Sequence, residues 1–205
     1  MDREELIQKI IEEKGVSAIP KIVDLLSEED VETRELARDI LEIMGAADGK
    51  DYLFEEFKNR FDLNEDDDIS LLYLAEILAD FECKEIIPYL ERMINNFSDE
   101  RAFPIIYENL LKLTKDEKYL EYIETYIDDG GELEEISIMA MTNMPSKRVV
   151  NNLISKYKNT NSNSIRALVL DSLVKVLLSD FELVSYLREI EPEISEKISW
   201  QLQKS

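Results

Sequence analysis

The feature that most constrains this 205-residue chain is a pair of amphipathic helices encoded by residues 15–45. The segment GVSAIPKIVDLLSEEDVETRELARDILEIMG holds two runs of apolar residues spaced three and four apart, a spacing typical of helices with one buried stripe. The two stripes are Ile19, Ile22, Val23 and Leu26, and then Leu36, Ala37, Ile40, Leu41 and Met44. Pro20 fits the first turn of a helix, where its missing N–H costs nothing. The short polar connection at residues 27–30 therefore predicts an antiparallel helical hairpin.

Weaker copies of this hairpin divide the rest of the chain. We expect a single domain over residues 1–205. Its predicted parts are a capping helix at 1–14, helix pairs at 15–45, 46–82, 83–113, 114–145 and 146–178, and C-terminal helices at 179–205. Five glycines and five prolines are few for a β protein with many turns and ordinary for helices joined by short loops. The predicted fold class is all-α, an α-solenoid of about five antiparallel helix pairs with terminal capping helices.

Local signals refine these boundaries. The segment ISLLYLAEIL (residues 69–78) is apolar almost all round, which places it in the middle of the stack. Capping boxes are expected at Thr114–Glu117 and at Ser179–Glu182, where a hydroxyl and a carboxylate satisfy two backbone N–H groups. Gly15 is expected to end the first helix.

The hairpin at 15–45 resembles a known repeat. A proline in the first helix, an acidic turn, and then Val31, Arg34 and Ala37 in the second helix resemble the short HEAT-like repeat, the type also found in bilin lyases. In the fifth pair, Arg166 occupies the place of Arg34, and Asp171 occupies the place of Asp39. The resemblance implies an α-solenoid, which is a surface for binding rather than a site for chemistry.

The charge of the chain is strongly acidic and unevenly spread. There are 46 acidic and 24 basic residues, a net charge of −22. Residues 1–145 carry −24, residues 146–178 carry +5 and residues 179–205 carry −3. An acidic body repels nucleic acid and anionic membranes and attracts basic proteins. We therefore expect a basic protein partner, with no nucleic acid and no membrane; the alternative is that the acidic excess serves solubility alone.

The chain lacks the residues on which several classes of catalytic site depend. The chain contains no histidine, which removes the commonest general base and the catalytic systems built on Ser-His or Cys-His pairs. Glycine-rich phosphate loops are missing, and Cys83 has only Lys84 as a basic neighbour, so we interpret it as a packing residue. We expect no enzyme activity, no cofactor and no metal. Without an apolar run of about 18 residues or a signal-like N-terminus, the expected location is the cytoplasm.

The acidic run at residues 62–68 invites comparison with a calcium loop. Asp62, Asn64 and Asp66 match three ligand positions of such a loop. Asp67 stands where the loop turns on a glycine, and Tyr73 stands where a glutamate completes the coordination. The segment is therefore predicted to be an acidic turn that caps the next helix.

The turns inside successive repeats of a solenoid align along one edge. Four of the five predicted turns are acidic, so this edge is expected to be a negative ridge that steers a basic partner; the alternative is a set of solvated helix starts. The exposed positions of the second helices would add a concave face. Its residues would be Glu35, Arg38, Glu42, Glu108, Lys112 and Asp171. The candidate protein-binding residues are Glu28, Glu29, Asp30, Glu35, Arg38, Glu42, Glu65, Asp66, Asp67, Asp68 and Trp200.

Two further features stand apart from the acidic edge. Lys147, Arg148, Lys156 and Lys158 form a basic island that fits a phosphate or an acidic stretch of another copy. Trp200 projects nearly opposite the predicted buried side of the last helix. It is expected either to anchor a partner or a second copy, or to cover the open end of the stack.

These observations favour a non-catalytic scaffold or adaptor for protein–protein interaction. A sharper version is an inhibitor that covers the nucleic-acid site of a basic nuclease. The resemblance also allows a subunit of a bilin-lyase-like enzyme, although no residue cluster points to a chromophore site. A HEAT-like DNA-repair glycosylase is disfavoured, because it requires a basic groove.

Overall fold

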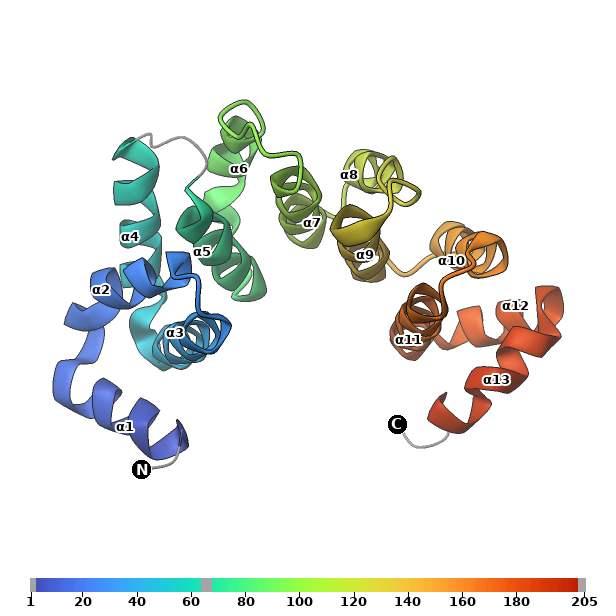
Figure 1. Ribbon diagram of the computed structural model, residues 1–205, viewed down its shortest axis with the longest axis horizontal. Helices are drawn as coiled ribbons and strands as arrows, with labels where there is room; N and C mark the ends of the chain where they lie inside the picture. The colour runs from blue at the N-terminus through green and yellow to red at the C-terminus, as the bar shows by residue number, and fades with distance from the viewer. Residues whose placement is uncertain (1–2, 64–67, 203–205) are drawn as a thin grey trace. The chain divides into compact units, whose positions relative to one another are not determined.

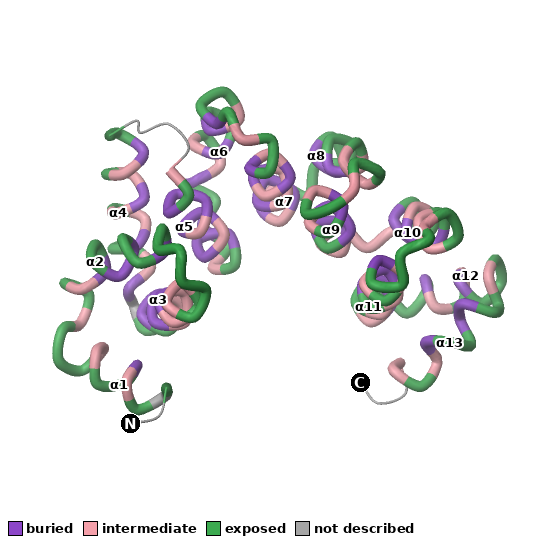
Figure 2. The backbone as a smooth tube through the Cα atoms, viewed as in Figure 1, coloured by how far each residue is buried: buried purple, intermediate pink, exposed green. Residues whose placement is uncertain are grey.

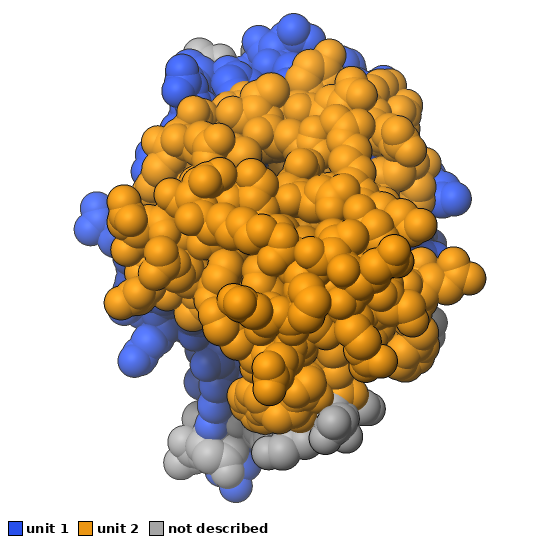
Figure 3. Space-filling model, turned by 90° about the vertical axis from the view of Figure 1, so that its right-hand side faces the viewer, with its two compact units in different colours: residues 1–113 blue, residues 114–205 orange. Residues whose placement is uncertain are grey.

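The protein is built from helices throughout the part that the structure describes. The computed structural model describes residues 3–63 and 68–202, and these ranges contain no strand (Figure 1). The predicted all-α class is confirmed. No helix within these ranges is both long enough and apolar enough to cross a membrane. The chain divides into two compact units, residues 1–113 and 114–205, which Figure 3 colours separately. The division falls at the start of the fourth predicted pair.

Unit 1 consists of consecutive helices joined by short connections. Its elements are α1 (Arg3–Lys14), η1 (Gly15–Ala18), α2 (Ile19–Asp24), η2 (Leu25–Ser27), α3 (Val31–Met44), η3 (Gly45–Gly49), α4 (Lys50–Leu63), α5 (Ile69–Asp80), η4 (Lys84–Ile86), α6 (Ile87–Met93) and α7 (Ala102–Thr114). Gly15 follows α1 with a φ of 55°, the left-handed conformation expected of a glycine that ends a helix.

Helices α2, α4 and α6 form one layer of unit 1, and α3, α5 and α7 form the other (Figure 1). Within the first layer, the α4 residue Arg60 pairs with Asp24 of α2 and donates to the carbonyl oxygen of Pro20 at 3.1 Å. The ring of Tyr89 on α6 packs edge-on against three phenylalanine rings of α4, with ring centroids 5.0 to 6.1 Å apart. Aromatic packing and one arginine therefore hold this layer together.

Helix α5 is the centre of unit 1. Most of its residues are buried, as Figure 2 shows by the run of buried backbone along it. These are Ser70, Leu71, Leu72, Leu74, Ala75, Ile77, Leu78 and Ala79. The helix packs on both α3 and α4, which agrees with its almost continuous apolar sequence.

Unit 2 repeats the alternation of layers. Its elements are α8 (Glu117–Glu124), α9 (Gly131–Ala140), η5 (Met141–Asn143), α10 (Lys147–Asn159), α11 (Asn163–Ser179), α12 (Phe181–Ile190) and α13 (Pro192–Leu202). Helix α11 packs on α9 and α13, and α10 packs on α12. Helices α10 and α11 pack on each other more extensively than any other two helices of the unit, which makes this pair its centre.

Two helix starts differ from the predicted capping boxes. Asp116, rather than Thr114, caps α8 by accepting from the backbone N–H of Lys118 at 3.0 Å. Asp180, rather than Ser179, caps α12. In both cases the hydroxyl residue still belongs to the preceding helix, and an aspartate next to it supplies a charged acceptor for the positive end of the new helix.

Candidate functional site

The predicted acidic turn before α3 has a structural role. Asp30 caps the helix, where its Oδ2 accepts from the backbone N–H of Thr33 at 2.8 Å and from the Thr33 hydroxyl at 2.6 Å. These bonds lower the pKa of Asp30. Arg34 Nη1 donates to the carbonyl oxygens of Glu28 at 2.8 Å and Glu29 at 3.2 Å, which fixes the turn. The side chains of Glu28 and Glu29 are exposed.

The acidic turn before α5 follows the same rule at its described end. Asp68 Oδ1 accepts from the backbone N–H of Ser70 at 2.9 Å and from its hydroxyl at 2.6 Å. The other predicted residues of this turn, Glu65, Asp66 and Asp67, lie outside the described residues. The acidic turns before α3 and α5 therefore act at least as helix caps.

A second surface of unit 1 is formed by one stripe from each of α3, α5 and α7, and we call it the α3–α5–α7 face. Each stripe has four residues at positions i, i+4, i+7 and i+11, which share one side of a helix. The stripes are Val31, Glu35, Arg38 and Glu42; Ile69, Tyr73, Glu76 and Asp80; and Ile105, Glu108 and Lys112 together with Arg101, which immediately precedes α7. All twelve residues are exposed or half-buried.

Ion pairs across neighbouring helices show that the stripes lie side by side. Arg38 of α3 reaches Glu76 of α5 at 3.3 Å and Asp80 at 3.6 Å, and it also pairs with Glu42 at 2.7 Å. Lys112 of α7 completes the network by pairing with Asp80 at 3.0 Å. Lys112 also pairs with Glu108 on its own helix at 3.3 Å. In the C-terminal half of the face, the two cations Arg38 and Lys112 thus form ion pairs with four carboxylates.

Glu76 is the most electrostatically strained member of this network. Its side chain is only 20% exposed, and burial raises its pKa to about 7. Arg38 and Lys112 oppose this shift, whereas the carboxylates of Glu108 and Asp80 add to it. Burial also disfavours the charged form of Lys112, but Glu108 and Asp80 outweigh it and raise the pKa of that amine. The pKa of Glu76 is therefore raised chiefly by burial, and the two cations do not offset that effect.

The N-terminal half of the same face is mostly apolar, with four apolar residues beside the exposed Glu35 and Arg101. Val31 and Ile69 begin α3 and α5, and they are 55% and 48% exposed. One turn further along, Tyr73 and Ile105 are half-buried. The face therefore presents an apolar strip beside a row of carboxylates.

The sequence analysis identified part of this face. Glu35, Arg38 and Glu42 lie on it, as do Glu108 and Lys112, which were expected on the same face as those three. Glu76 and Asp80 were missed because they sit in a helix whose sequence is otherwise apolar. Their spacing of four residues, together with the charged stripe of α3, was the available signal.

The predicted basic island of unit 2 is paired within the unit. Arg148 pairs with Glu124 and, at 3.4 Å, with Glu121. Lys156 pairs with Asp128 at 2.9 Å and with the buried Glu134 at 2.5 Å. Lys158 pairs with Glu191, and the amine of Lys147 lies 5.0 Å from the centre of the Tyr186 ring. The island is therefore a set of internal bridges between α10 and its neighbours.

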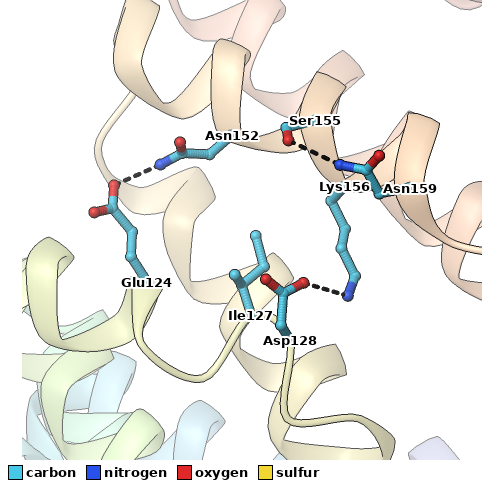
Figure 4. A pocket seen from close by; sticks show the side chains of 7 residues that line it. All are labelled: Glu124, Ile127, Asp128, Asn152, Ser155, Lys156 and Asn159. Atoms are coloured by element: carbon cyan, nitrogen blue, oxygen red, sulfur yellow. Dashed lines mark hydrogen bonds and ion pairs between the residues drawn. The ribbon is translucent and has the colours of Figure 1, made fainter.

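A cleft of about 220 Å³ lies between α10 and the end of α8 (Figure 4). Its lining is Glu124, Ile127, Asp128, Asn152, Ser155, Lys156 and Asn159. The Asn152 amide donates to Glu124 Oε1 at 2.6 Å, and the Asn159 amide donates to Ser155 Oγ at 3.3 Å. The polar groups that line this cleft satisfy one another, which gives it the character of a helix–helix junction.

Trp200 and Cys83 occupy contrasting environments. Trp200 is 57% exposed on α13, on the side opposite the buried Ile194 and Ile198, as its spacing predicts. It belongs to unit 2 and does not contribute to the α3–α5–α7 face, which lies in unit 1. Cys83 is 2% exposed and donates to Glu85 Oε2 at 3.4 Å. Burial raises the pKa of its thiol to about 11.

The comparisons with known proteins return no relative. No family model matches the chain, and neither the curated proteins nor the solved structures contain a match. Among the described residues, no group of three or more histidine, cysteine, aspartate or glutamate side chains is arranged to hold a metal ion.

Proposed function

We propose that the chain is an α-solenoid of the HEAT-like type, forming one domain over residues 1–205, and that it acts as a non-catalytic scaffold in the cytoplasm. Its partner is a basic protein, which binds the α3–α5–α7 face of unit 1. The regular alternation of two helix layers within each unit supports the solenoid part of the proposal.

The observation that carries the binding proposal is the charge balance of the α3–α5–α7 face. Arg38 and Lys112 are each already engaged by carboxylates of the same face, and four carboxylates compete for these two cations. The surrounding unit adds to the imbalance, since residues 1–113 contain 30 acidic and 13 basic residues. A cationic partner would relieve this repulsion and would be steered toward the face.

The same charge balance ranks the alternatives. An inhibitor of a basic nuclease would use the same face, with tighter binding. A HEAT-like DNA-repair activity is not supported, because the face would repel phosphates. The paired basic residues of α10 give no surface for nucleic acid either. No observation favours a bilin-lyase-like subunit over the scaffold.

The test compares two variants of equal charge. One variant neutralises the exposed carboxylates of the α3–α5–α7 face: Glu35→Gln, Glu42→Gln and Asp80→Asn. The matched control neutralises three exposed acids elsewhere in unit 1: Glu12→Gln, Asp51→Asn and Glu100→Gln. Both variants gain three units of charge, so a difference between them reports position rather than net charge.

Each immobilised protein is exposed to the source lysate at low and high salt, and retained proteins are identified by mass spectrometry. We expect a basic protein to be retained at low salt by the wild type and the control but not by the face variant, and to be released at high salt. Equal retention by the two variants would refute the assignment of this face.

A further inference from the structure

The α3–α5–α7 face has a shape and pattern that specify its partner further. We propose that it receives a basic amphipathic helix of the partner protein, which lies across α3, α5 and α7 with its apolar side on the apolar strip and its lysines and arginines on flanking carboxylates. This inference deepens the proposed function and rests on it.

The apolar strip is the first element of the argument. Val31 and Ile69 occupy the first positions of α3 and α5, and half of each side chain is open to solvent. Tyr73 and Ile105 extend the apolar surface by one turn. A purely ionic partner would leave this surface in water, whereas the apolar side of a helix would cover it.

Carboxylates border the strip at both ends. At the N-terminal end lie Glu28, Glu29, Asp30 and Asp68, and at the C-terminal end lie Glu42, Glu76, Asp80 and Glu108. Twelve residues separate Asp30 from Glu42, which is about 18 Å along the axis of α3, with the exposed Glu35 between them. An α-helix with its side chains is about 10–12 Å wide, so one helix fits between the two acidic rows.

The width of the face sets the length of the partner segment. Packed helices lie about 8–10 Å apart, so α3 to α7 spans about 20 Å. A helix covers this distance with about 14 residues at a rise of about 1.5 Å per residue. The partner segment is therefore about four turns long, with apolar residues every three or four positions and basic residues on its two flanks.

A second copy of this chain does not fit the site as well. The most basic segment of the chain, residues 146–178, has its α10 cations engaged within unit 2. Helix α10 therefore does not present its lysines and its arginine to a second copy. The charge of the face instead calls for a different, basic protein.

Glu76 adds a signature that only contact at this face produces. The groups facing its carboxylate are Arg38 from α3, Asp80 from α5, and Glu108 and Lys112 from α7, and Glu42 of α3 pairs with the same Arg38. A partner lysine or arginine beside Glu76 would favour its charged form, so binding would release a proton. For a pKa of about 7, the affinity for the helix should rise about tenfold from pH 6 to pH 8.

The experiment uses two synthetic peptides of about 14 residues with identical composition, equal parts leucine and lysine with alanine spacers. One places leucine on a single helical face, and the other is scrambled to spread leucine around the helix. Binding of each labelled peptide to the full-length protein is followed by fluorescence anisotropy at low salt. We expect the amphipathic peptide to bind at least about tenfold more tightly than the scrambled one, a difference that corresponds to burial of one or two apolar side chains.

Two pairs of substitutions assign the preference to the strip. Val31→Ser with Ile69→Ser should abolish the difference between the peptides, and because both side chains are half exposed the fold should tolerate the change. The control pair, Leu63→Ser with Phe181→Ser, alters two even more exposed apolar residues outside the face and should leave the difference intact. Glu76→Gln should bind the amphipathic peptide with no rise in affinity between pH 6 and pH 8.

The outcomes separate the two proposals. If both peptides bind equally and the Glu35→Gln, Glu42→Gln, Asp80→Asn variant loses both, the acidic face binds basic segments but the amphipathic helix is wrong. A preference that survives Val31→Ser with Ile69→Ser would also overturn it. If neither peptide binds the wild type at low salt, the proposed function fails as well.

Discussion

The pH dependence of stability at Glu76 can be worked out from its surroundings. The pKa of this carboxyl is raised from 4.5 to about 7, chiefly by burial, so the folded state holds a proton more tightly than the unfolded chain does. Stability therefore falls as the pH rises from about 4.5 to about 7, and the stabilisation of the protonated form is complete only at lower pH. The full shift corresponds to about 3 kcal/mol of unfolding free energy.

The substitution Glu76→Gln should remove this dependence, since glutamine resembles the protonated carboxyl in size and polarity. We expect wild type and variant to be about equally stable at pH 5, and the variant to be more stable by about 2–3 kcal/mol at pH 8. Urea unfolding followed by circular dichroism at several pH values measures both curves.

A nearby substitution provides the control. Glu42→Gln removes another partner of Arg38, but Glu42 is more exposed than Glu76 and should contribute less than about 1 kcal/mol at any pH. If the unfolding free energies of the wild type and Glu76→Gln changed in parallel with pH, burial would not raise the pKa of Glu76 in the folded protein. That result would refute the reasoning.

Three further substitutions or reactions test the interior. Arg60→Ala should lower the unfolding free energy by about 3 kcal/mol in urea titrations, because it strands Glu56 and breaks the link to α2; a loss below about 1 kcal/mol would contradict this. Asn109 is fully buried, and its amide has no hydrogen-bond partner among the described residues, so Asn109→Leu should raise the unfolding free energy by about 1–3 kcal/mol and with it the thermal midpoint; a lower midpoint would mean that the amide is satisfied. Cys83 should resist a thiol-specific reagent at pH 8 in the native protein and react once unfolded; rapid native reaction would contradict its burial and its raised pKa.

Helix positions were predictable because they depend on local spacing. The apolar stripes and the prolines at 20, 88 and 192 place each helix of the two units close to where it lies. The caps at Asp116 and Asp180 were misplaced by one or two residues, because a hydroxyl and a carboxylate compete for the same backbone N–H groups and only the fold decides between them.

The pairing of charges was not predictable from local sequence. Lys156 and Asp128 are 28 residues apart, and Lys112 and Asp80 are 32 apart, so their contact depends on how hairpins stack. For the same reason the basic island of α10 looked like a free surface. The isolated amide of Asn109 also escaped notice, since its helix reads as an ordinary apolar stripe with one polar residue.

The most direct test of the proposed binding surface is to map a basic amphipathic peptide onto the isotope-labelled protein by nuclear magnetic resonance. The account predicts that the backbone amide signals that move belong to α3, α5 and α7, with the largest changes near Ile69 and Glu76. Shifts concentrated in unit 2, or spread evenly over the acidic surface, would contradict it.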